Sequence, residues 1–345
     1  MKRRLDAVVV EPVLDGEPLI GVSRGDVTES VHRVAACARG RDGNVVFALG
    51  TIDVPVYLRS TAKPFIAAAA VREGVVERFG FEPHEVALMA ASHNGEPFHV
   101  AAVASMLRKI GMTEAALACG AHAPYDPASA DALLREGTPF TPIHNNCSGK
   151  HAGILALCTV LGADAATYRE PGNPAQRRIL QLCARACGQS VDELALAVDG
   201  CGIPVFATSL RHAALAFARF ATLDGLDERD AAALGTVRDA MLAFPQYVAG
   251  TGEFDTALMR AARGRIAAKS GAEGVHGLAD ITSGTGLVLK VIDGAARACA
   301  PAAVAIATQL GLLDAAERAE LAPFACTPVY NRAGLQVGSI EPLST

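Results

Sequence analysis

Short runs of apolar and β-branched residues alternate with turn signals near both ends of the chain. These runs cover residues 7–10, 18–22, 30–36 and 44–49, and later 265–268, 275–281, 286–292 and 328–340. Pairs such as Asp15-Gly16, Asp42-Gly43 and Asp293-Gly294 separate them. Runs of this length with Asp-Gly between them are typical of antiparallel strands joined by hairpin turns. We therefore predict strands at both ends of the chain.

Between these ends the apolar positions follow the helical period. Residues 152–161 and 227–244 show it, and so does a stripe that Gly111 closes, made of Phe98, Ala101, Ala102, Leu107 and Ile110. One sheet from both termini, formed by about 1–59 and 264–345, with a central helical region at about 60–263, explains this layout. We predict an α/β (α+β) fold in which residues 1–345 form a single compact chain.

Composition and charge exclude several classes of protein. Hydrophobic residues make up 51% of the chain and charged residues 19%, which excludes a disordered or fibrous protein. The formal net charge of -5, without a Lys/Arg-rich run, gives no sign of nucleic-acid binding. Asp6 and Glu11 interrupt the first apolar run, so we expect no export signal and a cytoplasmic protein. Charged and polar residues also break the apolar segment 295–313, which favours a packed helix over a membrane span.

The nine cysteines are irregularly spaced, and we expect reduced thiols. Cys183 and Cys187 lie one helical turn apart on a segment that opens with Asn173-Pro174 and closes with Gly188. Buried cysteine behaves as a small hydrophobic residue, so we interpret this pair as part of an apolar helix face.

Three short motifs in sequence order indicate a chemistry. Ser60-Thr61-Ala62-Lys63 reads S-x-x-K, Ser92-His93-Asn94 reads S-x-N, and Lys269-Ser270-Gly271 reads K-[ST]-G. Together they are the signature set of class A β-lactamases and penicillin-binding proteins. Each motif alone has an ordinary interpretation: a helix N-cap, a helix-ending turn and a charged strand end. Their order favours a serine nucleophile, activated by lysine, that attacks an amide.

The spacing of Ser60 and Lys63 places both side chains on one face of a helix. A serine hydroxyl needs a base to remove its proton, and lysine serves as that base only when it is neutral. Burial and the neighbouring charge of Arg59 would lower the pKa of Lys63. Free N–H groups at the helix start can stabilise an oxyanion. Gly271, in the third motif, would let a substrate approach closely.

A second cluster of reactive side chains occupies residues 143–153. Cys147, just before a predicted helix, should have a lowered pKa. It fits a cysteine nucleophile with His144 or His151 as base, a zinc ligand with a distant partner such as Cys201, or a structural loop residue. The spacing of the cysteines leaves all three interpretations open.

Four long strings of the sequence, taken together, resemble the Rhizobium etli-type L-asparaginases. They are Arg59–Phe65, Ala91–Pro97, His144–His151 and Asp199–Pro204, and the resemblance runs from about Val22 to the C-terminal hairpin. It implies a fold similar to serine β-lactamases and glutaminases. It also implies hydrolysis of L-asparagine to L-aspartate and ammonia, and a homodimer.

The resemblance also implies the roles of site residues. Two Ser–Lys pairs fall on Ser60 with Lys63 and Ser92 with Lys269. A zinc ion would be held by Cys147, Lys150 and Cys201, and Lys150 must then be neutral, so zinc affinity should drop as pH falls. From charge, we expect Arg59 to face the substrate α-carboxylate and Glu96 or Asp199 its α-ammonium. The expected substrate-binding set is Arg59, Asn94, Gly95, Glu96, Asn146 and Asp199.

Two other functions fit the same motifs. A penicillin-recognising β-lactam or peptide hydrolase would use the motifs on a different acyl group, and a fluorescent penicillin would then label Ser60. A non-catalytic zinc or amino-acid sensor would bind asparagine without releasing ammonia. We rank both below the asparagine amidohydrolase.

Overall fold

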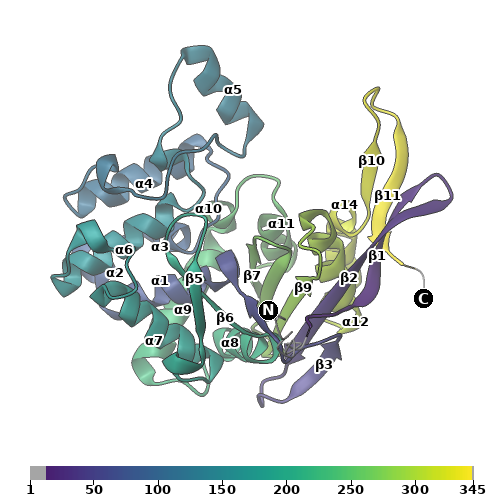
Figure 1. The fold of residues 1–345 in the computed structure, drawn as a ribbon, viewed down its shortest axis with the longest axis horizontal. Helices are drawn as coiled ribbons and strands as arrows, with labels where there is room; N and C mark the ends of the chain where they lie inside the picture. Colours follow the sequence, from purple (N-terminus) through teal and green to yellow (C-terminus); the bar gives the residue numbers. More distant parts are fainter. Residues whose placement is uncertain (1–12, 344–345) are drawn as a thin grey trace, which may run out of the picture.

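Strands from both ends of the chain form one sheet, as predicted. The computed structural model describes residues 13–343, so the predicted strand at 7–10 lies outside the described part. An eight-stranded antiparallel sheet runs in the order β10-β11-β1-β2-β9-β8-β7, with β3 also paired to β2 (Figure 1). Its strands are β1 (Glu17–Arg24), β2 (Val27–Arg39), β3 (Val45–Leu49), β7 (Ile266–Gly271), β8 (Val275–Asp280), β9 (Thr285–Val291), β10 (Thr327–Tyr330) and β11 (Gln336–Pro342).

The two ends of the chain meet inside this sheet. Strand β2 pairs with β9, and β1 pairs with β11, both antiparallel. Every residue of β8 and β9 is buried, because α8 (Leu210–Thr222) and α12 (Cys299–Gln309) both pack against these strands. The predicted fold class is therefore confirmed, and α12 is the packed helix expected in the segment 295–313.

A second, smaller sheet was not predicted. It has three antiparallel strands in the order β4 (Pro55–Tyr57), β6 (Pro204–Ser209) and β5 (Ala195–Val198). Two of these strands, β5 and β6, lie within residues 60–263, which were predicted to be helical. The prediction that this region is entirely helical is therefore wrong. Strands β5 and β6 are short, and Ala-Leu-Ala-Val has little strand preference of its own. Strand β6 pairs with β4, which is distant in sequence, and β5 pairs with β6, so the long-range pairing of β6 decides the structure.

The helices of the central region surround α1 (Lys63–Arg72). Helices α3, α6, α7 and α9 pack against it, and its residues from Lys63 to Val71 are buried. As predicted, α7 begins after the cap Asn173 and ends at left-handed Gly188. The other helices are α2 (Val75–Phe79), α3 (Pro83–Met89), α4 (Pro97–Lys109), α5 (Pro127–Glu136), α6 (Ser148–Leu161), α7 (Pro174–Cys187), α9 (Glu228–Ala243), α10 (Pro245–Val248), α11 (Phe254–Ala261), α13 (Ala315–Glu320) and α14 (Ala322–Ala325).

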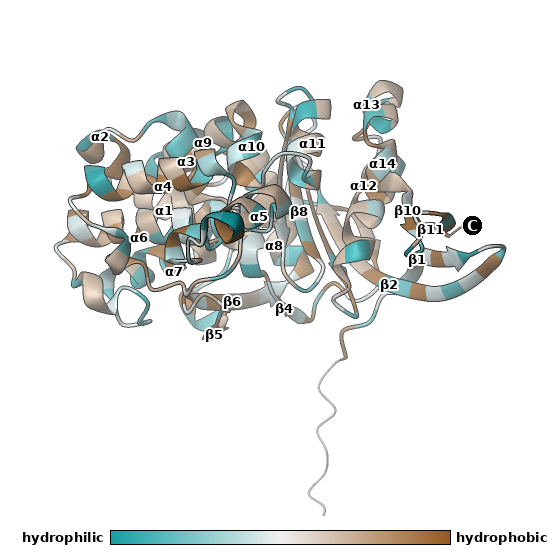
Figure 2. Ribbon diagram, turned by 90° about the horizontal axis from the view of Figure 1, so that it is seen from above, coloured by the Kyte–Doolittle hydropathy of each residue, from teal (hydrophilic) through white to brown (hydrophobic). Residues whose placement is uncertain are grey.

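The apolar stripe predicted for α4 is partly wrong. Ala101 is exposed and Phe98 is only half-buried, whereas His99 is buried because its ring Nε2 bonds to the carbonyl of Gln246. Figure 2 shows this helical part on one side of the molecule and α12–α14 beside the sheet on the other. No helix within residues 13–343 is both long enough and apolar enough to cross a membrane.

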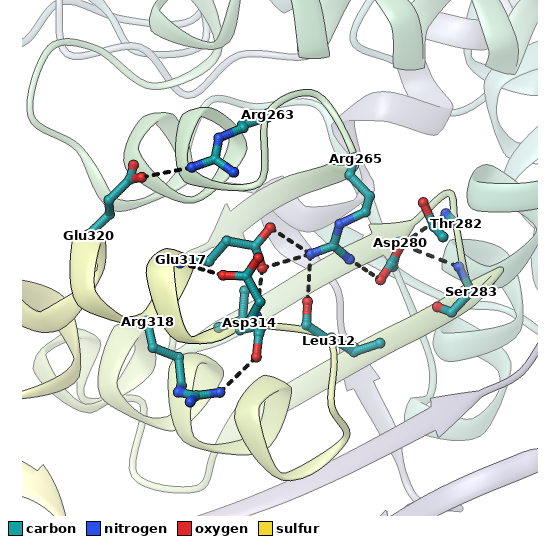
Figure 3. Close-up of polar contacts among 11 residues, drawn as sticks. Arg263, Arg265, Asp280, Thr282, Ser283, Leu312, Asp314, Glu317, Arg318 and Glu320 are labelled. Carbon is teal, nitrogen blue, oxygen red and sulfur yellow. Dashed lines mark hydrogen bonds and ion pairs between the residues drawn. The ribbon is translucent and has the colours of Figure 1, made fainter.

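A buried ion-pair cluster ties the start of β7 to α13 (Figure 3). The Arg265 guanidinium donates to Asp280, to both carboxylate oxygens of Glu317 at 2.9 and 2.8 Å, and to the carbonyl of Leu312 at 2.8 Å. Both carboxylates are buried. Two buried negative charges therefore depend on one cation.

Replacing Arg265 with methionine should strongly destabilise the fold. The substitution leaves two buried carboxylates without a counter-charge, which costs about 3–5 kcal/mol in comparable sites. Urea unfolding of the two proteins would measure the loss. The matched control is Arg318→Met, on the exposed face of α13, where we expect a change within about 1 kcal/mol. Equal stability of the Arg265 variant and the wild type would contradict this interpretation.

Candidate active site

Ser60 lies at the junction between the small sheet and the central helix. Strand β4 leads into the 3₁₀ helix η1 (Arg59–Ala62), and α1 follows without a break. Ser60 is half-buried, whereas Lys63 is 1% exposed. One small pocket is lined by residues of three predicted strings: Arg59, Ser60, Lys63, Lys150 and Asp199.

The Lys63 ammonium group points toward the end of α3. Its Nζ donates to the carbonyl of Ala91 at 2.6 Å and to Ser92 Oγ at 2.9 Å. Within residues 13–343 no hydrogen bond joins Lys63 Nζ to Ser60 Oγ, although the backbone N–H of Lys63 donates to the carbonyl of Ser60. The partner of Lys63 is thus Ser92, which the sequence analysis had paired with Lys269. Burial lowers the pKa of Lys63, and the charge of Lys150 lowers it further against the opposing effect of Cys147. These effects favour the neutral amine that a base requires.

Lys269 is fully buried on β7. Its Nζ donates to the carbonyl of Ser270 at 2.7 Å and lies 3.7 Å from Asp255 Oδ2. Burial lowers the pKa of Lys269 to about 8. No hydrogen bond to Ser92 is present in the described part of the chain, so the predicted pair of Ser92 with Lys269 is not joined directly here.

Gly271 has a different role from the one expected. A Cβ at this position would lie 2.5 Å from Thr61 Oγ1 and 3.0 Å from the carbonyl of Leu58. The missing side chain therefore makes room for η1, not for substrate. This close approach brings the edge of β7 against the turn that carries Ser60.

The S-x-N motif lies in a loop held by a second loop that the sequence analysis missed. The backbone N–H groups of Ser92 and Asn94 donate to the carbonyls of Val248 and Ala249, both at 2.9 Å. Gly95 takes the left-handed conformation, with φ of +83°, that the Asn-Gly turn predicted. Asn94 is buried, and its Oδ1 accepts no hydrogen bond within the described residues.

Two predicted substrate-binding residues support these loops. The Glu96 carboxylate accepts the N–H of Thr251 at 2.9 Å. Asn146 donates its backbone N–H to His122 Nε2 at 3.0 Å, and its carbonyl accepts the N–H of His93 at 3.2 Å. Both residues therefore hold backbone in place around the S-x-N motif.

Arg59 and Asp199 form an ion pair beside Ser60. Arg59 Nε lies 2.7 Å from Asp199 Oδ1, and the turn between β5 and β6 presents the carboxylate. Burial tends to raise the pKa of Asp199, but Lys150 and Arg59 lower it overall. Arg59 has a φ of +51°, which is uncommon for a residue other than glycine. Such strain next to a candidate nucleophile is typical of functional sites.

Cys147, Lys150 and Cys201 are buried together beside this pair. Lys150 Nζ donates to Cys201 Sγ at 2.9 Å, and the Cys201 thiol lies 3.7 Å from Asp199 Oδ2. Donation from Cys201, together with the charges of Lys150 and Lys63, holds the pKa of Cys147 well below its usual range. The two cysteines and Asp199 raise the pKa of Lys150 despite its burial.

The chemistry of this donor set fits zinc. Two sulfurs and one amine can supply three of the four ligands of a tetrahedral zinc site. No group of three or more His, Cys, Asp or Glu side chains within residues 13–343 is placed to hold a metal, so the set depends on Lys150.

The histidines do not support a cysteine nucleophile. His144 Nδ1 accepts the N–H of Thr141 at 3.0 Å, and His151 Nδ1 shares a hydrogen bond with the Tyr168 hydroxyl at 2.6 Å. Neither ring bonds to Cys147 within the described part of the chain. The buried pair of Cys183 and Cys187 is apolar, as predicted, and burial raises the pKa of both thiols.

The comparison with protein families agrees with this geometry. The family described as L-asparaginase II matches residues 20–342, nearly the whole chain. The chain belongs to the L-asparaginase II family. This membership makes the protein a hydrolase of the asparaginase type, which acts on amides. No curated protein sequence matches the chain.

Several solved structures are similar to this family member. A putative β-lactamase from Bacteroides dorei DSM 17855 is 16% identical, with a TM-score of 0.41, and the match covers 80% of this chain and 86% of that one. A β-lactamase from Mycobacterium bovis is 17% identical, with a TM-score of 0.39 and coverage of 85% and 95%. The protein titled Mglu is 15% identical, with a TM-score of 0.38, and the match covers 82% of this chain but only 62% of Mglu.

Proposed function

We propose that this family member hydrolyses L-asparagine to L-aspartate and ammonia, with Ser60 as the nucleophile. The observation that carries the proposal is the buried Lys63, which lines the same pocket as Ser60 and donates to Ser92. A buried lysine with a lowered pKa is the base that a serine nucleophile needs. The family supplies the reaction type.

In this mechanism neutral Lys63 removes the proton from Ser60, whose Oγ attacks the side-chain carboxamide carbon. Backbone N–H groups near Ser60 would stabilise the oxyanion. Those of Thr61 and Lys63 already donate to the carbonyls of Leu58 and Ser60. Lys63 returns the proton through its 2.9 Å bond to Ser92, from which the leaving nitrogen takes it and departs as ammonia. Lys269 completes this relay with its positive charge. Water then hydrolyses the β-aspartyl ester.

Charge complementarity places the rest of the substrate. Arg59 would bind the α-carboxylate of the substrate, and Asp199 would bind its α-ammonium. The two charged groups of the substrate would then replace the contact between Arg59 and Asp199. Among the residues that the structure describes, none donates to the buried Asn94 Oδ1, and a carboxamide N–H would supply a donor. Glu96 is the weaker candidate for the α-ammonium, because its carboxylate already accepts the N–H of Thr251.

Cys147, Lys150 and Cys201 would hold a zinc ion beside this substrate position. When bound, zinc supplies an orienting positive charge whose Lewis acidity the two thiolates weaken. Lys150 must lose its proton to act as a ligand, and so must any thiol that still carries one.

Zinc affinity should fall steeply with falling pH. The raised pKa of Lys150 means that zinc must displace a proton, which weakens binding by about tenfold per pH unit for each proton displaced. Competition with a chromophoric chelator across mildly acidic to alkaline pH would measure this. Lys150→Arg, which cannot ligate, should lose tight binding, whereas Lys109→Arg on α4 should not. Affinity that is independent of pH, or that survives in Lys150→Arg, would refute the zinc proposal.

Acid-quenched mass spectrometry tests the proposed function and its nucleophile together. Protein mixed with L-asparagine, quenched and digested, should carry a β-aspartyl ester on the peptide that contains Ser60. The ester on Ser92 would move the nucleophile, and a thioester on Cys147 would restore the cysteine mechanism. Labelling of Ser60 by a fluorescent penicillin, without an aspartyl ester, would favour the β-lactam hydrolase.

A further inference from the structure

Asp255 is a buried carboxylate in the first turn of α11 that the mechanism above does not use. It is 2% exposed. Its Oδ1 accepts hydrogen bonds from His276 Nε2 at 2.9 Å and from Ser270 Oγ at 2.7 Å. Its Oδ2 accepts the backbone N–H of Ser270 at 2.7 Å and lies 3.7 Å from Lys269 Nζ. Asp255 therefore contacts two of the three residues of the K-S-G motif.

The fold brings these groups together from three elements. Strands β7 and β8 are antiparallel, and their register places Ser270 opposite His276. Helix α11 packs against β7 and directs Asp255 at this pair. A buried carboxylate costs several kcal/mol unless donors surround it, so the arrangement is a built feature of the sheet edge. No sequence motif predicts it, because an Asp in the first turn of a helix is common.

The hydrogen bonds also limit what Asp255 can do. Both oxygens already face two donors each, so the carboxylate has no free position from which to take a substrate proton. Its remaining influence is through Lys269, whose ammonium it attracts, and through Ser270, whose backbone it fixes. Such a group acts on a reaction by positioning another.

We propose that Asp255 is a positioning residue that keeps the Lys269 ammonium charged and in place at the end of β7. This proposal rests on the proposed function, in which Lys269 completes the proton relay with Ser92. It adds the Asp255 carboxylate, as a positioning group, to the two serines and two lysines of the proposed mechanism.

The charges around Lys269 set the sign of the expected pH effect. The groups that face it are Asp255 from α11, Lys63 from α1 and Cys147 at the start of α6, and His276 from β8 contacts Asp255. Burial lowers the pKa of Lys269 to about 8, Asp255 opposes that change, and Lys63 adds to it. Lys269 supports the relay only while protonated, so activity should fall as pH rises through about 8. Without the Asp255 charge, the pKa of Lys269 falls and this loss begins at lower pH.

The test compares Asp255→Asn with wild type in kcat, KM and their pH profiles. We expect kcat to fall by about tenfold or more with KM changed less than about threefold, and the alkaline limb to move to lower pH. The matched control is Glu253→Gln, which removes a neighbouring carboxylate from the N-cap of α11 and should leave the limb in place. Asp255→Glu keeps the charge and should also keep the limb.

A readout that needs no turnover separates this proposal from the proposed function. Lysine labelled with ¹³C at Cε reports its own titration by NMR, and the chain has few lysines: Lys2, Lys63, Lys109, Lys150, Lys269 and Lys290. The resonance that disappears in Lys269→Arg should titrate near pH 8 in wild type and at lower pH in Asp255→Asn.

The outcomes distinguish the two proposals. Suppose that Lys269 titrates at lower pH in Asp255→Asn than in wild type, but that the wild type hydrolyses no amide. This result would reject the proposed function and leave the charge-holding role of Asp255 standing. Hydrolysis by wild type with the same Lys269 titration in both proteins would overturn that role. If Asp255→Asn does not fold, Asp255→Glu decides, because a limb shifted to lower pH despite the retained charge would overturn the proposal.

Discussion

Replacing Ser60 with alanine should lower the rate of asparagine hydrolysis by about 10⁴-fold or more, as removal of the nucleophile does in other serine hydrolases. The fold should stay intact, because the Ser60 side chain makes no hydrogen bond within residues 13–343. The loss should appear in kcat, since the pocket that binds asparagine keeps its charged residues. Ammonia release measures the rate, and urea unfolding checks the stability.

Two further serines make the result specific. Ser92→Ala removes the hydroxyl bonded to Lys63 and should slow the reaction less than Ser60→Ala, because proton transfer typically contributes about 10²–10⁴-fold. Ser105→Ala, on α4 away from the pocket, should have no effect. If Ser60→Ala keeps most of the activity while Ser92→Ala loses it, Ser92 is the nucleophile.

Replacing Lys63 with methionine should lower kcat by about 10³-fold, because the variant has no base to activate Ser60. Methionine fills a similar volume in the packed core, so the loss should not come from a cavity. The carbonyl of Ala91 and the hydroxyl of Ser92 lose their donor, which costs about 1–3 kcal/mol of stability at most. Parallel kinetics and unfolding curves separate the two effects.

Lys63→Arg tells a base from a mere positive charge. Arginine keeps the charge but cannot lose its proton in a protein. If Lys63 acts as a neutral base, the arginine variant should be as inactive as the methionine variant. Recovery of activity with arginine would show that Ser60 is activated by charge alone.

Much of the fold could be predicted from the sequence because its signals are local. Short apolar runs marked the strands of both termini, Asp42-Gly43 marked the turn between β2 and β3, and the caps Asn173 and Gly188 marked α7. The small sheet could not be predicted, because it depends on the pairing of β6 with β4, which is distant in sequence. The exposed Ala101 and the buried His99 of α4 likewise reflect tertiary packing.

The candidate site divides in the same way. The motifs identified the residues that line one pocket, but not their partners. Lys63 bonds to Ser92, and Gly271 makes room for Thr61, because α3, β7 and η1 meet in space. The loop at 248–251 and the carboxylate of Asp255 carry no motif, and only the fold places them at the site. The zinc ion, the homodimer and the cytoplasmic location stay predictions.

The most direct test is the release of ammonia and aspartate when purified wild-type protein is given L-asparagine, with L-glutamine in parallel. We predict one ammonia for each aspartate formed, and no release by Ser60→Ala under the same conditions. Tight binding of asparagine without ammonia release would favour the sensor. A folded protein, supplied with zinc, that releases ammonia from neither amide would contradict the proposed function.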